Sequence, residues 1–358
     1  MANLSTSSEL NLGNWPEGGL ENVSRCPVCD SRRRKLIHAS LRDRVFANAP
    51  GEWNLHACED CGCAYWDPRP TAATIGLAYE NYLTHAPGGG VEYAQANWWR
   101  RFRIAQRNAY LNAAYGYHLK PAAWNPVFLG NARRRRFDSF TGYIRFPGPG
   151  ARALDIGCGN GSFLWQLRSL GWEVCGVEPD PKSAAHARDA GLDVRDGLLQ
   201  QQSFPEAHFD GITMTHVIEH LHEPMDTLRR CWKLLKPGGQ ITVSTPNLGS
   251  RGHAIFGENW FALMPPTHLV LFTENSLRRA MESCGFVVSR PPRPSLRARE
   301  MFKASQTLVL TGPGKKREQH LPWTARVKVE WLAARANLAT RGNPAVTEEL
   351  VLLGKKPA

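Results

Sequence analysis

The clearest periodicity in the 358-residue chain begins at Arg152, where short apolar runs alternate with amphipathic segments. An apolar run that ends at Asp155 predicts a buried strand, and residues 162–170 repeat apolar positions at helical spacing until Gly171 ends the pattern. A second apolar run, Glu173–Val177, predicts another strand. Strands and helices that alternate at this spacing favour an α/β fold with a parallel sheet.

Upstream of residue 150 the pattern is mainly helical. Three segments place apolar residues at helical spacing: Ala72–Tyr82, Trp98–Leu111 and Arg133–Phe140. Gly88–Gly90 predicts a hinge, and the Pro/Gly run at 147–150 marks a boundary. We therefore expect a helical lid or linker over residues 71–150 and a larger domain over 151–358. Residues 1–24 are rich in Ser, Asn and Gly without periodicity, which predicts a mobile leader.

Two pairs of cysteines lie between the leader and the helical region. Cys26/Cys29 and Cys58/Cys61 each have a two-residue gap, and 28 residues separate the pairs. Four sulfurs at this spacing suit a tetrahedral zinc ion, and full protein ligation leaves no position for chemistry. The spacing predicts a structural zinc ribbon over residues 25–70, with redox thiols as the alternative. If one of the four ligands is wrong, Cys63 and His56 are the nearest substitutes. Between the two cysteine pairs we expect short strands at Leu36–His38 and Trp53–His56.

Composition and charge bear on the location of the protein and on the partners it could bind. The apolar runs are far shorter than the roughly 18 residues that span a bilayer, and the N-terminus lacks a signal-peptide pattern, so we expect a cytoplasmic protein without a membrane span. The net charge of +12 is uneven. Residues 1–150 carry 18 basic and 12 acidic groups, residues 151–290 carry 13 and 15, and residues 291–358 carry 13 and 5. The basic flanks indicate either an anionic partner or a solvated basic face.

A glycine-rich turn follows the first strand of the α/β segment. Gly157, Gly159 and Gly161 allow a ligand to approach the backbone closely at the start of a helix. Glu178 ends the next strand, where a carboxylate can accept hydrogen bonds from both hydroxyls of a ribose. Asp155 stands two residues before the first glycine, where it would repel a pyrophosphate but suits a ligand with an ammonium group.

The combination of D-x-G-x-G-x-G with an acidic residue at the tip of the second strand resembles the class I S-adenosylmethionine-dependent methyltransferases. This resemblance implies a Rossmann-like seven-stranded sheet and S-adenosylmethionine as cofactor. It places Asp196 and Leu198 beside the adenine. It also implies further elements at Val194–Asp196, Phe209–Met214, Leu277–Cys284, Gly285–Ser289 and Glu348–Leu353. Residues 291–345 would form an insertion before the last strand, with one helix near Trp323–Ala339.

Within that superfamily, the chain is similar to bacterial relatives of the ubiquinone-pathway O-methyltransferases that carry a CPVC…CxxCG ribbon followed by PRPT. The motifs that carry the similarity are HVIEH at 216–220, STPN at 244–247 and WFALxPPxHLxxFT at 260–273. Relatives often have Arg immediately before the histidine of the last motif, whereas this chain has Thr267. The similarity implies methylation of a saccharide or another small molecule.

Methyl transfer requires an aligned donor and acceptor and removal of the acceptor's proton. A neutral imidazole suits the second task near pH 7. His220 and Glu219 follow the fourth strand, and His268 follows two prolines, so we expect these three residues to form the acceptor site. His216 is expected to shape the cofactor pocket. An alternative role for Glu219 and His220 is to bind a divalent ion.

The leading functional hypothesis is O-methylation of a sugar, a glycan precursor or another secondary metabolite. An RNA base methyltransferase is the runner-up, because a zinc ribbon and basic flanks suit nucleic acid. The N/D-P-P-Y/F tetrapeptide used by many amino-directed enzymes is absent, which disfavours the RNA hypothesis. Two further hypotheses are C-methylation of a keto-sugar nucleotide and a non-catalytic interaction protein that binds the cofactor. The sequence gives no oligomeric state.

Overall fold

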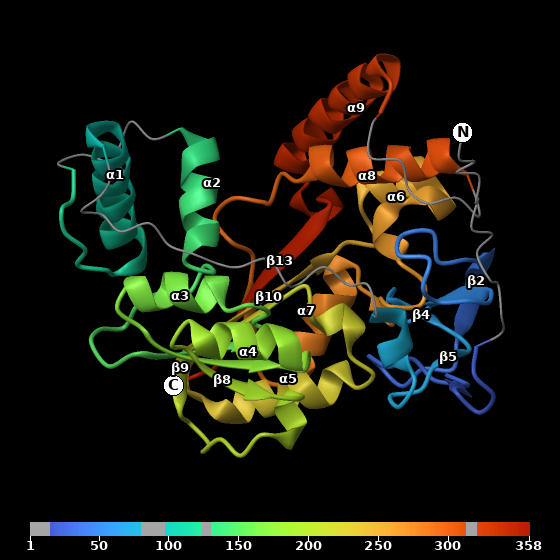
Figure 1. Ribbon diagram of the computed structural model, residues 1–358, viewed down its shortest axis with the longest axis horizontal. Coiled ribbons are helices and arrows are strands. Elements are labelled where there is room, and N and C mark those ends of the chain that lie inside the picture. Colours follow the sequence, from blue (N-terminus) through green and yellow to red (C-terminus); the bar gives the residue numbers. More distant parts are fainter. Residues whose placement is uncertain (1–14, 80–96, 124–129, 313–320) are drawn as a thin grey trace, which may run out of the picture.

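The computed structural model describes residues 15–79, 97–123, 130–312 and 321–358, and Figure 1 shows the whole arrangement. An α/β core occupies the centre, and the N-terminal ribbon packs at one end of it. Helices α1 and α2 lie at the opposite end, and α8 and α9 lie along the top in this view. No helix among these described ranges is long and apolar enough to cross a membrane.

The core is a seven-stranded sheet with the order β12-β13-β10-β9-β6-β7-β8. Its strands are β6 (Arg152–Ile156), β7 (Glu173–Glu178), β8 (Asp193–Asp196), β9 (Phe209–Thr215), β10 (Leu235–Pro246), β12 (Val287–Ser289) and β13 (Glu349–Lys355). Strands β10, β9, β6, β7 and β8 pair in parallel, whereas β13 is antiparallel to both of its neighbours. The Rossmann-like seven-stranded sheet expected from the sequence is therefore confirmed.

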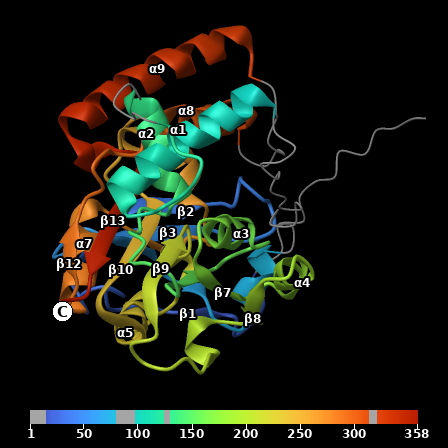
Figure 2. The ribbon, with the colours of Figure 1, turned by 90° about the vertical axis from the view of Figure 1, so that its left-hand side faces the viewer.

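Helices cover both faces of this sheet, as Figure 2 shows. They are α3 (Ser162–Ser169) and α4 (Pro181–Asp189) on one face, and α5 (Pro224–Leu234) and α7 (Glu274–Ser283) on the other. Leu228 and Met281 from the second pair are fully buried against strand residues such as Ile212 and Val243. Because both faces are covered, residues 211–214 of β9 and 241–246 of β10 are buried, and these stretches include the polar side chains of Thr213, Thr242 and Thr245.

The ribbon is continuous with the core. Its four-stranded sheet has the order β11-β4-β3-β2, formed by β2 (Arg34–Leu41), β3 (Trp53–Cys58), β4 (Ala64–Trp66) and β11 (Val270–Leu271). Strand β11 belongs to the segment that follows His268, so one strand of the ribbon sheet comes from the downstream domain. This pairing fixes the ribbon against the loop that carries the expected acceptor-site histidine.

The structure corrects the expected boundary of the leader. Trp15 is buried and packs edge-on against Trp53, with ring centroids 5.5 Å apart. Strand β1 (Leu20–Glu21) pairs with β5 (Arg69–Pro70). The expectation of a mobile segment over residues 1–24 is thus wrong for residues 15–24, because an aromatic anchor and a short strand hold them, while residues 1–14 lie outside the described residues.

Helices α1 (Trp98–Tyr115) and α2 (Asn131–Phe140) form the expected helical region before the core. Asn97 caps α1 by accepting a hydrogen bond from the backbone N–H of Arg100, and Gly116 ends the helix in a left-handed conformation. The helix expected over 72–82 is a 3₁₀ turn at Ile75–Tyr79 as far as it is described. The hinge expected at Gly88–Gly90 lies outside the described residues.

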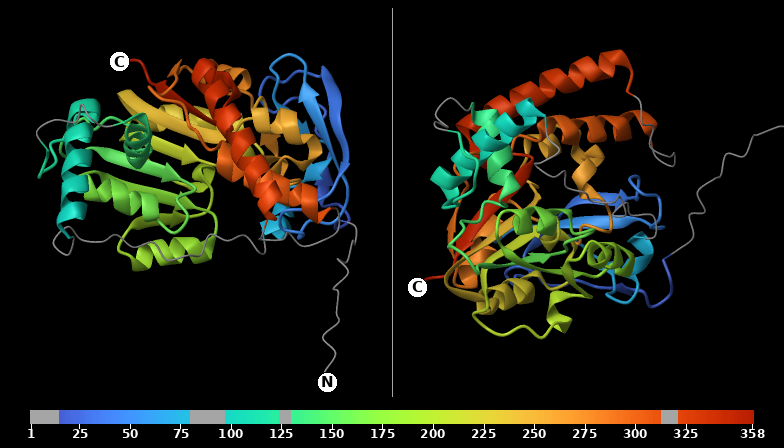
Figure 3. Two further views of the ribbon diagram at one scale, coloured as in Figure 1. Left: turned by 90° about the horizontal axis from the view of Figure 1, so that it is seen from above. Right: turned by 60° about the vertical axis from the view of Figure 1, so that its left-hand side comes forward.

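The insertion before the last strand contains two described helices where the sequence analysis expected one. Helix α8 (Ala298–Thr311) precedes α9 (Trp323–Gly342), and a short α6 (Arg251–Phe256) packs beneath α8. Phe302 of α8 is fully buried in a cluster with ribbon and loop residues, which explains why this segment is ordered. The views in Figure 3 show α8 and α9 side by side along the top of the molecule.

Candidate active site and metal centre

The glycine-rich turn lies at the carboxyl end of β6, the edge where ligands bind in open parallel sheets. Gly157 has φ +68°, and a Cβ at this position would lie 2.4 Å from Cγ2 of Val217. A Cβ at Gly161 would lie 2.4 Å from Cδ1 of Leu192. The glycines therefore let the turn pack against the loop after β9 on one side and against α4 and its following turn on the other.

Glu178 and Asp155 lie together behind this turn. Glu178 accepts hydrogen bonds from the backbone N–H groups of Gly159 (2.7 Å) and Asp180 (2.9 Å). Asp155 accepts one from the hydroxyl of Thr213 at 2.7 Å. Burial raises the pKa of Glu178, and burial together with the nearby charge of Glu178 raises the pKa of Asp155 to about 7.

These two buried carboxylates form no salt bridge within the described part of the chain. A cationic ligand would relieve both the desolvation of Asp155 and its repulsion from Glu178. The electrostatics therefore fit a donor molecule that carries an ammonium group and a ribose, as the sequence predicts.

The expected adenine contacts lie on the loop after β8. Leu198 leaves 45% of its surface exposed, and Asp196 is paired with Arg188 at 2.8 Å. An exposed apolar side chain at this edge suits contact with a flat ring. The roles of Asp196 and Leu198 stay predictions.

The structure brings together Glu219, His220 and His268. Glu219 and His220 lie in a 3₁₀ turn, Ile218–His220, immediately after β9, and His268 lies on the loop before β11. One ligand-type atom from each of the three side chains lies within 4.8 Å of the others, and the two imidazole rings meet edge to face with centroids 4.7 Å apart. Residues nearly fifty positions apart in the sequence thus form one buried cluster.

Backbone carbonyls fix the tautomers of both histidines. Nδ1 of His220 lies 2.8 Å from the carbonyl oxygen of Thr267, and Nδ1 of His268 lies 2.7 Å from that of Ala262. A carbonyl can only accept, so each Nδ1 carries the proton and each Nε2 carries a lone pair. Burial lowers the pKa of His220 and lowers that of His268 to about 3, so both imidazoles are neutral near pH 7.

Glu219 is the anionic member of this cluster. Although burial opposes ionisation, hydrogen bonding to His216 and the positive charge of that ring lower the pKa of Glu219 to about 2. Its Oε1 lies 3.3 Å from Nδ1 of His216, whereas its buried Oε2 has no hydrogen-bond partner within the described residues. A buried carboxylate oxygen without a partner is costly, which indicates that a proton donor or a cation occupies this position in the working protein.

His216 has contacts that the sequence analysis did not foresee. Its Nε2 lies 2.8 Å from Oε1 of Glu349, the first residue of β13, and its backbone N–H donates to the carbonyl of Ser244. Burial disfavours its charged form, but the hydrogen bonds to Glu219 and Glu349 raise the pKa of His216 to about 10. His216 is therefore protonated and links the carboxylates of Glu219 and Glu349. Its expected place in the cofactor pocket stays a prediction.

Two residues near the cluster were missed by sequence reasoning. Tyr79 places its hydroxyl 2.8 Å from Nδ1 of His220, and Glu349 holds His216. Tyr79 comes from a segment that was interpreted only by its helical spacing, and Glu349 from the expected last strand. Neither stands in a motif, so their polar roles depend on tertiary contacts alone.

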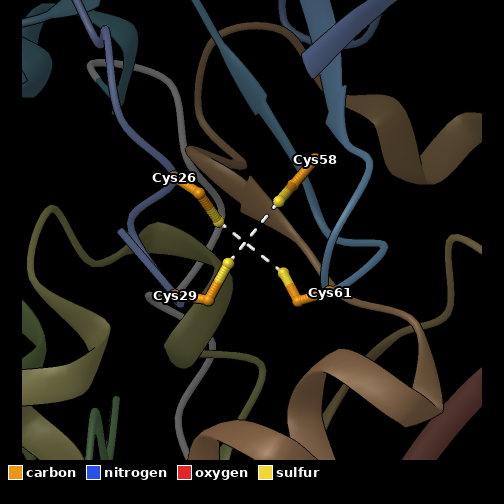
Figure 4. Close-up of side chains that lie close together, drawn as sticks. All are labelled: Cys26, Cys29, Cys58 and Cys61. Carbon is orange, nitrogen blue, oxygen red and sulfur yellow. Dashed lines mark hydrogen bonds between the residues drawn. The ribbon is translucent and has the colours of Figure 1, made fainter. Parts of the chain in front are cut away.

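Among the residues that the structure describes, two groups of side chains could hold a metal ion. The donor set of Glu219, His220 and His268 is two imidazoles and one carboxylate, a set that suits divalent transition metals. The second group is the four predicted ribbon cysteines, whose side chains converge in Figure 4: Cys26, Cys29, Cys58 and Cys61.

The geometry of the sulfurs fits zinc. The Sγ atoms of Cys26 and Cys61 are 3.6 Å apart, and those of Cys29 and Cys58 are 3.5 Å apart. A tetrahedron with zinc–sulfur bonds of about 2.3 Å has edges of about 3.8 Å. The cluster could therefore bind zinc after a slight expansion. Cys63, the expected substitute, places its Sγ 3.3 Å from that of Cys26.

Comparisons with known proteins find methyltransferases. Residues 130–290 match the family model of a methyltransferase domain. A ubiquinone biosynthesis O-methyltransferase of Maricaulis maris (strain MCS10) is 34% identical over 181 residues, which cover 47% of this chain and 71% of that protein. The protein of the same name from Caulobacter vibrioides is 37% identical over 137 residues, which cover 35% of this chain and 53% of the relative.

The chain thus spans about half the length of the Caulobacter relative and a larger share of the Maricaulis relative. Among solved structures, a SAM-dependent methyltransferase from Archaeoglobus fulgidus is 19% identical, with a TM-score of 0.40, and the match covers 73% of this chain and 100% of that chain.

Proposed function

This chain belongs to the family of S-adenosylmethionine-dependent methyltransferases, and we propose that it methylates an oxygen of a sugar, a glycan precursor or another small secondary metabolite. The observation that carries the proposal is the cluster of Glu219, His220 and His268 at the carboxyl edge of the sheet, next to the glycine turn. Two neutral imidazoles with fixed tautomers beside a carboxylate form an arrangement that removes a proton from a hydroxyl group.

The cofactor, when bound, supplies a methyl group on a sulfonium that leaves as a neutral thioether. Glu178 would accept hydrogen bonds from its ribose, and Asp155 would face its ammonium group through the glycine turn. Asp196 and Leu198 would contact the adenine. These groups follow the carboxyl ends of β6, β7 and β8, and Gly157 of the same turn packs against Val217, which immediately precedes the turn that carries Glu219 and His220.

His220 is the general base in this proposal. Its ring is only partly buried, whereas His268 is 4% exposed and its pKa of about 3 makes it a poor proton acceptor. Nδ1–H of His220 donates to the carbonyl of Thr267, so Nε2 carries the lone pair and would be the atom that takes the acceptor's proton. Glu219 stabilises the imidazolium that forms, and His268 orients the acceptor by accepting a hydrogen bond.

A direct test uses the purified protein with labelled methyl donor and host extract, with and without ribonuclease. The proposal expects a labelled, ribonuclease-resistant small molecule whose label is lost on ether cleavage. His220→Gln should reduce labelling by about 10²–10⁴-fold without changing donor affinity. His186→Gln, which changes an exposed histidine on α4, is the matched control and should leave labelling unchanged.

Different outcomes of this experiment identify the competing functions. Label that disappears with ribonuclease indicates an RNA base methyltransferase, and label on a carbon atom indicates C-methylation of a keto-sugar nucleotide. Donor binding without any labelled product across extracts favours a non-catalytic interaction protein. Each of these results overturns O-methylation of a small molecule.

The partnerless Oε2 of Glu219 favours a second role for the same cluster, binding a divalent cation. In that case Glu219, His220 and His268 would hold the ion, and the ion would lower the pKa of the acceptor's hydroxyl. Dialysis against a chelator should then abolish turnover, and added Mg²⁺, Mn²⁺ or Zn²⁺ should restore it. Unchanged turnover after chelation would exclude this metal role, and the imidazole of His220 would then act as the base without a cation.

A further inference from the structure

Helix α9 is apolar on two opposite faces. Its buried residues Val329, Ala333, Ala336 and Thr340 recur at intervals of three and four, so they form one stripe that packs on the protein. A surface helix that packs by one stripe normally presents a polar face to water. The outward face of α9 does not follow this rule.

The outward face carries four large apolar side chains. Trp323 is 76% exposed, Val327 60%, Trp331 56% and Leu338 66%. At 100° per residue these four positions fall within an arc of about 80°, on the side of the helix away from the buried stripe. Figures 1 and 2 show α9 along the outer edge of the molecule.

Basic residues flank the exposed stripe on both sides. At helical spacing Arg326 and Arg341 lie along one border, and Lys328 and Arg335 lie along the other. The guanidinium of Arg335 lies 4.5 Å from the ring centroid of Trp331. The helix has one acidic residue, Glu330, which pairs with Arg299 at 2.6 Å.

A second aromatic and basic patch lies at the start of α1. Trp98, Trp99 and Phe102 are 65%, 56% and 48% exposed, within the sequence WWRRFR. In Figure 1 α1 lies at the end of the molecule opposite the ribbon, whereas α9 lies along the top.

We propose that the outward face of α9 binds the surface of an anionic phospholipid membrane, with the helix lying in the plane of the interface. Tryptophan prefers the headgroup region, aliphatic side chains enter the acyl boundary, and flanking Arg and Lys contact anionic headgroups. The proposal goes beyond methyl transfer and stands independently of which acceptor is used.

The charge and apolar character of this face favour a phospholipid surface over a second copy of α9 or single-stranded RNA. A second copy of α9 would bring four basic residues against four others, with Glu330 already paired, so like-charge repulsion opposes self-association. Single-stranded RNA would use the two tryptophans for stacking but would leave Val327 and Leu338 against sugar and phosphate. Of these three occupants, a lipid surface is the one that matches both the aliphatic side chains and the basic borders.

Flotation of the full-length protein with vesicles tests the proposal. Vesicles of phosphatidylcholine with about 30% phosphatidylglycerol should bind the protein at least tenfold more tightly than phosphatidylcholine alone, and high salt should weaken binding. Trp323→Ser with Trp331→Ser should lower the affinity at least tenfold. Arg326→Gln with Arg335→Gln should remove most of the preference for anionic vesicles.

The matched control removes two exposed apolar side chains elsewhere, by Leu36→Ser and Val287→Ser, which are 53% and 64% exposed. This control should bind vesicles as the unchanged protein does. Circular dichroism and donor affinity verify that every variant is folded. The proposal is overturned if vesicles do not bind, or if the α9 variant binds as well as the control. It is also overturned if Trp331→Ser dissociates a dimer, or if the stripe binds an RNA oligonucleotide in place of vesicles.

Discussion

Substitution of Gly157 by alanine tests how the cofactor turn and the histidine loop are packed together. Gly157 has φ +68°, a left-handed conformation that costs an alanine about 1–2 kcal/mol. Its new Cβ would also lie 2.4 Å from Cγ2 of Val217, against an ordinary contact of about 3.5–4.0 Å. Overpacking of this kind costs about 1–3 kcal/mol. We therefore expect Gly157→Ala to lower the free energy of unfolding by about 2–5 kcal/mol.

Two further variants separate the backbone cost from the steric cost. Gly159 has φ +55°, and an added Cβ there would have no atom within 4 Å, so Gly159→Ala should show only the backbone cost of about 1–2 kcal/mol. In Gly157→Ala with Val217→Ala the nearest remaining atom is Cβ of residue 217, 3.6 Å away in the present structure. The double variant should recover the steric part, about 1–3 kcal/mol, as coupling in a double-mutant cycle.

The assay is urea unfolding followed by fluorescence, with donor affinity measured by calorimetry on the same samples. Val217 precedes the turn that carries Glu219 and His220, so the displaced loop should also reduce turnover in Gly157→Ala. Equal stability of Gly157→Ala and Gly159→Ala, or the absence of coupling with Val217→Ala, would refute the packing on which this reasoning depends.

Three other predictions use the same preparations. Glu178→Ala should weaken donor binding at least tenfold, because a buried carboxylate that would accept ribose hydrogen bonds is lost, and calorimetry measures the change. His268→Ala should mainly raise the acceptor's Michaelis constant while donor affinity stays the same; loss of donor binding instead would show that our division of the pocket is wrong. Cys29→Ser should lower the zinc content below about one ion per chain and destabilise the ribbon without changing donor affinity, and a fully folded wild-type protein without zinc would contradict the structural role.

The sequence predicted the elements whose signals are local. The glycine turn, the strand-terminal Glu178 and the paired cysteines each need only a few neighbouring residues, and the structure places them as expected at the sheet edge and in the ribbon. The order and spacing of the core strands follow from the same local alternation of apolar runs. The structure that each of these local patterns predicts depends little on distant parts of the chain.

The features that were missed depend on contacts between distant segments. Strand β11 pairs with the ribbon across some two hundred residues of sequence, and two-residue strands carry no periodicity of their own. Trp15 lies in a segment whose composition predicts a polar leader, and only its tertiary contact with Trp53 shows that it is part of the folded ribbon. The sequence likewise gives no sign that Glu349, over a hundred positions after His216, joins Glu219 in raising the pKa of that histidine.

Asp155 should make donor binding depend on pH. In the ligand-free protein its pKa is about 7, above the usual value of about 3.9 in an unfolded chain. Because the folded-state pKa is raised, the ligand-free protein loses stability as the pH rises from about 4 to about 7. A cationic donor needs the ionised carboxylate, so its affinity should increase about eightfold from pH 6 to pH 7.5, in proportion to the ionised fraction.

Asp155→Asn keeps an oxygen to accept the hydrogen bond from Thr213 but cannot ionise, so its donor affinity should be lower and nearly independent of pH over this range. Glu348→Gln is the matched control, because Glu348 is also a buried acid whose pKa burial raises to about 7, but it hydrogen-bonds to Gly252, away from the glycine turn. The control should keep the full pH dependence. If Asp155→Asn kept it as well, the titrating group would lie elsewhere, and the ammonium of the donor would not be recognised through Asp155.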